Sequence, residues 1–234
     1  MSLAFLFAAS PFDSKLAMIM LDVPITHRMV QIRSNGRRLQ GDLLLPEDAH
    51  GLAIFAHGPG SNRGSARTQA VARRLQDIGY GTLLVDLLEL AEQESRKTFE
   101  TPILALRLRS AAEWCAADAA TCNLPIAYFG ANGAAAAAIA AAARQPDQVK
   151  AIVSGGGRPD LAWDDLALLQ TPTLLLVGSK DAAALDLNRR AFEKMTCPRE
   201  LLLVSGTTHH FSEPGALDEV AKLTARWFDR YLKP

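Results

Sequence analysis

Three polar residues stand behind separate apolar runs of this 234-residue chain, at the positions where a nucleophile, an acid and a base would work together. Asn132 lies in the tight segment Gly130-Ala-Asn-Gly-Ala134, and Asp181 and His209 each follow a later apolar run. An aspartate can orient a histidine, and the histidine can then act as a general base toward a nucleophile held in a sharp turn. The order of turn, acid and histidine predicts one site built from the ends of three strands.

The elements that must position these residues alternate along the chain between short apolar runs and segments of helical periodicity. We expect strands at 30–32, 39–45, 52–56, 82–85, 126–129, 151–153, 173–177 and 201–204. We expect helices at 66–78, 102–120, 134–143, 184–195 and 215–232. Asn35-Gly36 between the first two runs predicts a hairpin. The pattern predicts an α/β fold, a three-layer α/β/α sandwich with a mostly parallel sheet of about eight strands and an antiparallel N-terminal hairpin.

Composition excludes several classes of function. The 25 basic side chains balance 25 acidic ones, which argues against nucleic acid as a partner because phosphate binding needs a basic surplus. The three cysteines form no CxxC pair, as is typical of a reducing cytoplasm, and predict neither a disulfide framework nor a metal site. We expect a cytoplasmic protein, monomer or homodimer, that binds a small molecule and uses no cofactor.

The N-terminus calls for a separate interpretation. The apolar run Leu3–Ala9 is too short to span a bilayer and has no basic residue before it, so no membrane partner is expected, although a weak signal peptide is an alternative. We interpret residues 1–27 as an N-terminal extension and residues 28–234 as a single domain.

A set of motifs at the expected strand ends carries a family resemblance. They are His57-Gly58-x-Gly60-Ser61, Tyr128-Phe-Gly-Ala131 before an alanine-rich helix, Thr171–Gly178, and Thr208-His209. From about Val30 to Leu232 the sequence resembles the α/β-hydrolase superfamily and, within it, the dienelactone hydrolase group. The resemblance implies the α/β-hydrolase fold, a small ester or lactone as substrate, His209 as general base and Asp181 as its orienting partner. His210 is expected at the mouth of the pocket or in the core.

Two departures from the family pattern bear on catalysis. The nucleophile elbow of the fold reads G-x-S-x-G, whereas here Asn132 replaces the serine, and an amide is not an acyl-transfer nucleophile. Pro59 lacks the backbone N–H that one oxyanion-hole donor would need. Gly133 keeps the other donor, and Gly60 could supply a replacement. We expect catalytic positions at Asn132, Asp181 and His209, ligand contacts at Gly58, Pro59, Gly60, Gly133 and His210, and impaired or absent hydrolysis.

Several alternatives remain open on the sequence. The chain could be a non-catalytic relative that only binds a small ligand. Deamidation of Asn132, which precedes a glycine, would create an aspartate nucleophile. Ser61 or Ser154 could act as a substitute nucleophile, although loop hydrogen bonds are the simpler expectation for both. Asn132 could also replace a serine of an active parent chain.

Overall fold

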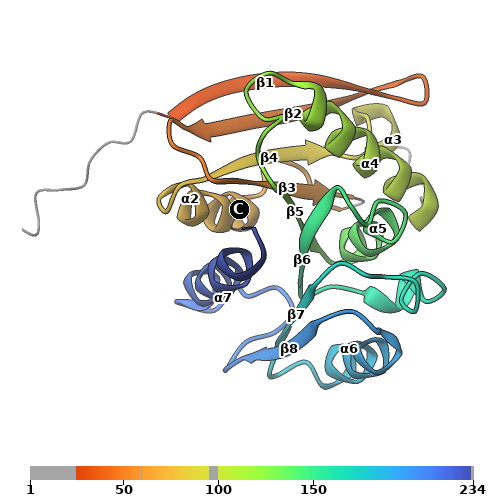
Figure 1. The fold of residues 1–234 in the computed structure, drawn as a ribbon. Helices are drawn as coiled ribbons and strands as arrows, with labels where there is room; N and C mark the ends of the chain where they lie inside the picture. The colour runs from red at the N-terminus through yellow and green to blue at the C-terminus, as the bar shows by residue number, and fades with distance from the viewer. Residues whose placement is uncertain (1–24, 59, 95–99, 233–234) are drawn as a thin grey trace, which may run out of the picture.

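A single eight-stranded sheet forms the centre of the molecule. The computed structural model describes residues 25–58, 60–94 and 100–232. Along the sheet the strands follow the order β1-β2-β4-β3-β5-β6-β7-β8 (Figure 1). Their bounds are β1 Ile25–Ser34, β2 Arg37–Pro46, β3 Gly51–His57, β4 Tyr80–Asp86, β5 Ile126–Ala131, β6 Val149–Gly155, β7 Thr173–Gly178 and β8 Arg199–Val204. β1 pairs antiparallel with β2, and β2 antiparallel with β4, while the other neighbours are parallel.

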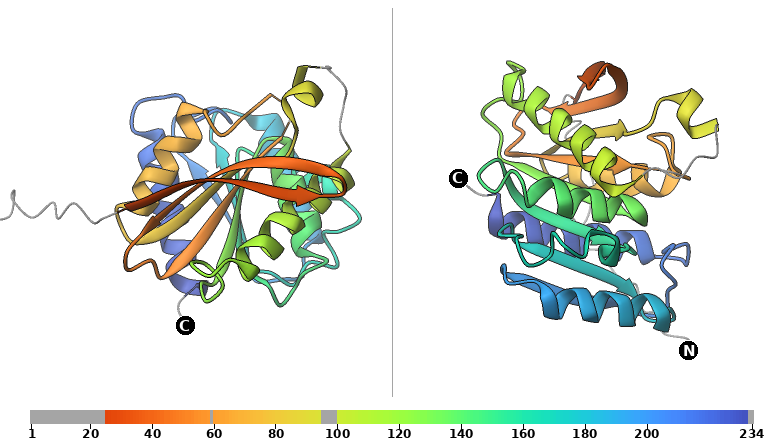
Figure 2. Two further views of the ribbon diagram at one scale, coloured as in Figure 1. Left: turned by 90° about the horizontal axis from the view of Figure 1, so that it is seen from above. Right: turned by 90° about the vertical axis from the view of Figure 1, so that its right-hand side faces the viewer.

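Helices cover both faces of this sheet, which gives the expected three layers (Figures 1 and 2). Their bounds are α2 Ala66–Gln76, α3 Leu90–Glu94, α4 Thr101–Ala117, α5 Gly133–Ala142, α6 Ala182–Lys194 and α7 Ala216–Tyr231. One apolar core lies under α2 and α7, and a second lies under α4, α5 and α6. The predicted fold class, an α/β sandwich with an antiparallel N-terminal hairpin, is confirmed.

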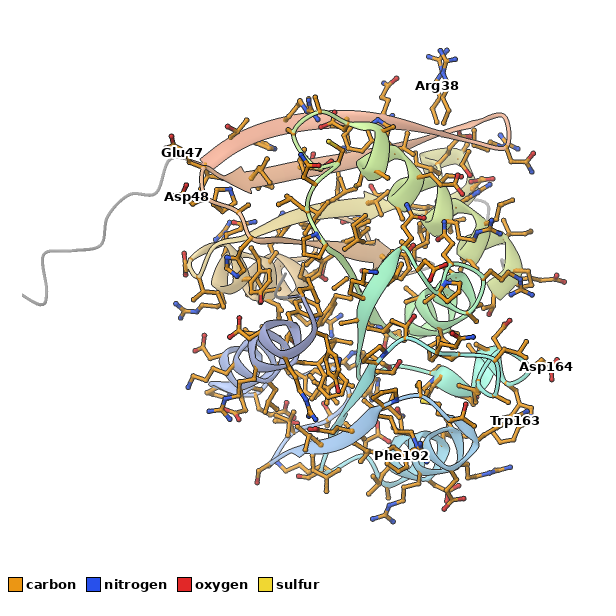
Figure 3. All side chains as sticks on the ribbon, viewed as in Figure 1. Arg38, Glu47, Asp48, Trp163, Asp164 and Phe192 are labelled. Atoms are coloured by element: carbon orange, nitrogen blue, oxygen red, sulfur yellow. The ribbon has the colours of Figure 1, made fainter. Side chains whose placement is uncertain are left out.

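Small and β-forming residues explain the central packing. β3 and β4 are buried along their whole lengths, as expected of strands with helices on both sides. Residues 134–142 of α5 are all buried and all alanine except Ile139. Side chains this small allow the helix to approach the sheet closely, so the alanine run is core and not a low-complexity segment. Figure 3 shows the side chains that fill the space between the layers.

The N-terminal hairpin turns at the predicted dipeptide. Asn35 and Gly36 both have positive φ, at 45° and 76°, and Ser34 pairs with Arg37 across the turn. Two residues with positive φ define a type I′ turn, whose twist matches that of the strands. The turn is exposed, and Arg38 beside it points away from the sheet (Figure 3).

Some elements differ from expectation at their ends. The short helix α3 and the 3-10 helix η1 (Pro159–Ala162) were not predicted, because segments of four or five residues show no clear periodicity. β1 begins at Ile25, so residues 25–27 of the predicted extension pair with β2. The rest of that extension, residues 1–24, lies outside the described residues, and the division at residue 27 stays a prediction. Among the described residues no helix has the length and apolarity needed to cross a membrane.

Candidate active site at the carboxyl ends of the strands

Asn132 occupies a strained turn between β5 and α5. Its backbone angles are φ 51° and ψ −131°, a region that residues with a side chain rarely adopt. Gly130 makes the turn possible, because a Cβ there would lie 2.7 Å from the carbonyl oxygen of Ala134 and 2.7 Å from Cα of Ala135. Local sequence and close packing of α5 on β5 therefore fix the elbow together.

Hydrogen bonds hold the elbow from outside the turn. The carbonyl oxygen of Asn132 accepts from the backbone N–H of Ala135 at 3.2 Å and from that of Arg158 at 3.0 Å. Arg158 is held in turn by two bonds from its guanidinium to Asp160. Within the described part of the chain, the backbone N–H of Gly133 has no acceptor, so it is free to donate to a ligand.

Asp181 and His209 come together from loops 28 residues apart in sequence. Nδ1 of His209 lies 2.6 Å from Oδ2 of Asp181. The other oxygen, Oδ1, accepts from the backbone N–H of Ala184 at 2.9 Å, so the same carboxylate caps α6. That backbone bond, followed by the bond to His209, lowers the pKa of Asp181 below its usual value. An ionised carboxylate only accepts, so Nδ1 of His209 carries a proton, and the neutral imidazole has its lone pair on Nε2.

The loop that carries His209 is packed tightly against a glycine turn. Gly156 has φ 58°, and a Cβ on it would collide with the carbonyl oxygen of His209. On the other side, the backbone N–H of Thr208 donates to Glu213 at 3.0 Å. The glycines after β6 therefore allow the loop that carries His209 to pack closely against them. The run of glycines was the only sign of this close packing in the sequence.

His210 lies beside His209 and is held by Arg67. The two imidazole ring centroids are 4.0 Å apart, and Nη1 of Arg67 lies 2.8 Å from Nδ1 of His210. Because arginine only donates, Nδ1 of His210 must accept, which places its proton on Nε2. Burial, then the neighbouring charges of His209 and Arg67, lowers the pKa of His210 and favours this neutral form. The sequence gives no sign of this contact, because the two residues are 143 positions apart.

A small hollow joins these groups. Asn132, His209 and His210 line it together with Arg67 and Ser61, and its volume is about 40 Å³. Its apolar wall is formed by the side chains of Val71, Phe129, Leu217 and Val220. Among the residues expected to contact a ligand, His210 lines the hollow, whereas Gly58, Gly60 and Gly133 lie outside its lining. Pro59 lies outside the described residues.

The loop after β3 turns at the expected place. The backbone N–H of Ser61 donates to the carbonyl oxygen of Gly58 at 3.1 Å, and Gly60 has φ 77°. Just before it, His57 is 2% exposed, and its Nδ1 lies 3.3 Å from the carbonyl oxygen of Val85. Burial lowers the pKa of His57 to about 4, so this imidazole is neutral near pH 7.

The two serines proposed as substitute nucleophiles differ in position. Ser61 lines the hollow, whereas the Oγ of Ser154 is buried and has no hydrogen-bond partner in the described part of the chain. A Cβ on Gly157 would collide with that Oγ, which shows how closely the glycine turn covers it. The loop hydrogen bond expected for Ser154 is therefore wrong, because the side chain faces the packed interior. Over the described ranges, no group of three or more His, Cys, Asp or Glu could hold a metal ion.

Solved structures give the clearest comparison. Dienelactone hydrolase from Anabaena variabilis is 40% identical, with a TM-score of 0.86 over 89% of this chain and 99% of its own. Est1E from Butyrivibrio proteoclasticus, at 16% identity, has a TM-score of 0.73 over 86% of this chain and 98% of its own. A dienelactone hydrolase-like promiscuous phosphotriesterase from metagenomic libraries, at 18% identity, has a TM-score of 0.71 over 88% and 98%. The last two likenesses show the fold alone.

Curated sequences add longer relatives. Two proteins from strains of Mycobacterium tuberculosis, each named provisionally as a phosphoribosyl transferase, are 43% identical over 212 residues, or 90% of this chain. The chain spans about half the length of these relatives, 48% of each. No protein-family model matches the sequence. The identity to the Anabaena enzyme over nearly its whole length decides the family: the chain belongs to the dienelactone hydrolases of the α/β-hydrolase fold.

Proposed function

We propose that this chain binds a small ester or lactone in the hollow beside Asn132 and His209, and that the encoded sequence does not turn it over by covalent acyl transfer. The observation that carries the proposal is the mismatch at one site. An oriented base, His209 on Asp181 at 2.6 Å, shares a hollow with an elbow residue that has no nucleophilic atom.

The base half of the site suits hydrolase chemistry. The Nε2 lone pair of His209 can accept a proton, and the carboxylate of Asp181 stabilises the imidazolium that results. Their side chains are 40% and 21% exposed, so a ligand and water can reach the pair. These features support a role for both residues at the reacting end of a bound carbonyl compound.

The nucleophile half does not suit acyl transfer. A serine hydroxyl gives up a proton and attacks a carbonyl carbon, whereas the amide of Asn132 has no comparable pair of electrons to offer. The free N–H of Gly133 can still donate to a ligand carbonyl oxygen. Proline at position 59 has no N–H to act as the second donor. Loss of one such donor costs about 2.7–4 kcal/mol of transition-state stabilisation, so both changes act against turnover.

The shape of the hollow favours a small ligand. Its volume of about 40 Å³ lies far below the roughly 300–1,000 Å³ of pockets for drug-sized molecules. The apolar wall suits the carbon skeleton of a short ester or lactone, and Arg67 and His210 offer donors at the mouth. This arrangement supports a compact substrate-like ligand with one or two oxygen acceptors.

The substitution Asn132→Ser tests the proposal. Freshly purified protein should neither react with a fluorophosphonate probe nor release a burst from p-nitrophenyl acetate. Asn132→Ser should label stoichiometrically, because it returns a hydroxyl to a strained turn that shares its hollow with an oriented base. Adding His209→Ala to that variant should remove the labelling. Stoichiometric labelling of the encoded chain, or none of a correctly folded Asn132→Ser, would show the proposal to be wrong.

Binding without turnover needs its own measurement. Titration with γ-butyrolactone, followed by the NMR signals of the His209 imidazole and the Gly133 amide, should shift both signals in a saturable way. Asn35→Ser, in the distant hairpin turn, is the matched control and should leave those shifts unchanged. Absence of any saturable shift would remove the ligand-binding part of the proposal.

A further inference from the structure

We propose that Asn132 is a self-modification site, at which the backbone nitrogen of Gly133 attacks the Asn132 side-chain amide and converts this residue to aspartate through a succinimide. The dipeptide alone permits this reaction, because glycine leaves its nitrogen unhindered. The folded elbow goes further and arranges the atoms that must react. Conversion is independent of the ligand that the hollow binds.

The ψ angle of Asn132 already suits ring closure. A succinimide ring contains Cβ, Cα and the carbonyl carbon of the asparagine and the nitrogen of the next residue, so Cβ and that nitrogen must be nearly eclipsed about the Cα–C bond. At an L-residue Cβ is rotated by about 120° from the backbone nitrogen about this bond. With ψ at −131°, the nitrogen of Gly133 therefore almost eclipses Cβ of Asn132.

The attacking nitrogen is also accessible and activated. In the described part of the chain the N–H of Gly133 has no acceptor, and a Cβ on Gly133 would meet nothing within 4 Å. Removing the proton from this N–H moves negative charge onto the carbonyl oxygen of Asn132. That oxygen accepts bonds from the N–H groups of Ala135 and Arg158, and the positive end of α5 begins at Gly133, so the anion is stabilised.

The side chain that must move is not held by the helix that it precedes. Asn132 stands at the N-cap of α5 and makes no side-chain capping bond. The side-chain amide of Asn132 and the imidazole of His209 line the same hollow, so a base lies beside the side-chain amide that must leave.

The step balances with water as its only co-reactant. A bond forms between the Gly133 nitrogen and Cγ of Asn132, and the bond between Cγ and Nδ2 breaks. The proton lost by Gly133 reaches the departing nitrogen through the base, and ammonia leaves. Water then adds across the imide. Cleavage between Cγ and the ring nitrogen gives aspartate, and cleavage of the backbone carbonyl bond gives isoaspartate.

Aspartate at position 132 would give the elbow a nucleophile that the encoded chain lacks. A carboxylate oxygen can attack an electrophilic carbon that bears a leaving group, so that a C–O ester bond forms while the leaving group departs with its bonding electrons. Water deprotonated by His209 then adds to the carboxyl carbon, the bond between that carbon and the alkyl oxygen breaks, an alcohol is released and the carboxylate is restored. The conversion would therefore change a binding site into a site with nucleophile, base and orienting acid.

The chain contains its own comparator in the hairpin. Asn35-Gly36 is the same dipeptide with a similar φ of 45° at its asparagine, but it forms a type I′ turn. In that turn ψ of the first central residue is about +30°, the mirror image of type I. The nitrogen of Gly36 then lies far from Cβ of Asn35, and ring closure would first have to undo the turn.

Peptide mapping by mass spectrometry tests the inference. Freshly purified protein is incubated at neutral pH, either native or in guanidinium, and conversion at both asparagines is followed by mass and by isoaspartyl methyltransferase labelling. In the native protein Asn132 should convert about tenfold faster than Asn35, which corresponds to an activation free energy about 1.4 kcal/mol lower. In guanidinium the two rates should become similar, because the fold no longer sets either ψ.

Gly133→Ala is the matched control. The added methyl group has open space, and residue 133 begins a helix, so folding should persist while conversion at Asn132 slows and conversion at Asn35 does not change. A native protein in which Asn35 converts and Asn132 keeps its amide would overturn the inference. An Asn132-to-Asn35 rate ratio that is equal in native and denatured protein would do so too. Neither readout depends on ligand binding.

Discussion

Two Asn-Gly dipeptides in this chain fold into different turns. Asn35 and Asn132 have nearly equal φ angles, 45° and 51°. The residue that follows, however, has φ 76° at Gly36, whereas Gly133 begins α5. The hairpin turn is exposed at the end of β1 and β2, and the elbow is half-buried between β5 and α5. The same two residues therefore form a purely structural turn in one place and part of the candidate active site in the other.

This difference shows that the Asn-Gly dipeptide determines the geometry of the hairpin turn but not that of the elbow. In the hairpin, Asn-Gly already prefers the type I′ geometry and needs only two paired strands. At the elbow, ψ of −131° is not a local preference of asparagine. It is imposed by the approach of α5 to Gly130 and by the bonds from Ala135 and Arg158. Two pairs of substitutions test this contrast, and two further predictions concern His57 and Asp181 at the same end of the sheet as the elbow.

The largest effect should come from Gly130→Ala. The new Cβ would lie 2.7 Å from the backbone of α5, so the free energy of unfolding should fall by about 3 kcal/mol. Gly36→Ala at the hairpin should cost only about 1 kcal/mol, because its Cβ meets nothing and only the positive φ is unfavourable. Urea denaturation measures both, and equal losses would contradict the contrast.

Acid should lower the free energy of unfolding through His57, the last residue of β3. His57 has a pKa of about 4 in the folded chain and about 6.5 when unfolded, so between these values only the unfolded chain takes up a proton. Stability from the neutral imidazole is therefore lost as pH falls, by about 2 kcal/mol between pH 7 and pH 5. Urea titrations at both pH values should show this loss in the encoded chain and a smaller one in His57→Gln. Identical losses in the two proteins would exclude His57 as its source.

Relief of backbone strain should differ between the two asparagines. Asn132→Gly should raise the free energy of unfolding by roughly 1–2 kcal/mol, because only glycine adopts the elbow geometry without strain. Asn35→Gly should change it by less, since asparagine tolerates the left-handed region of the hairpin. Thermal unfolding of the two variants is the measurement, and a larger gain at Asn35 would reverse the proposed order.

The smallest effect concerns Asp181. Asp181→Ala removes the cap of α6 and should cost about 1 kcal/mol. Asp181→Asn keeps an oxygen for the N–H of Ala184 and should cost less, while changing the signal of His209 as much as alanine does. Chemical denaturation and histidine NMR separate the two roles of this side chain. Equal stability losses for alanine and asparagine would argue against the capping role.

Much of the architecture could be predicted from local pattern. The eight strands, the five long helices and the hairpin at Asn35-Gly36 follow from periodicity and turn residues, and all are present. The short elements α3 and η1 could not be predicted, because so few residues carry no period. Their positions depend on contacts with the neighbouring layers.

For the candidate site, the sequence identified residues but not their neighbours. Asp181 and His209 were expected together from the order of the strands, and the contact between Arg67 and His210 was not, because it joins residues 143 positions apart on the surface. The loop hydrogen bond expected for Ser154 does not form, since the sequence does not show which way a residue at a strand end faces.

The sequence by itself determined the chain order of elbow, acid and histidine that predicts one site, the absence of a serine at position 132 and the hairpin turn. Each depends on residue type or on period. Only the tertiary structure decided the ψ angle of Asn132 and the contact between Arg67 and His210. Those depend on the approach of segments distant in the chain, which a local preference of about 1 kcal/mol cannot fix. Two identical dipeptides therefore acquire different chemistry from the packing around them.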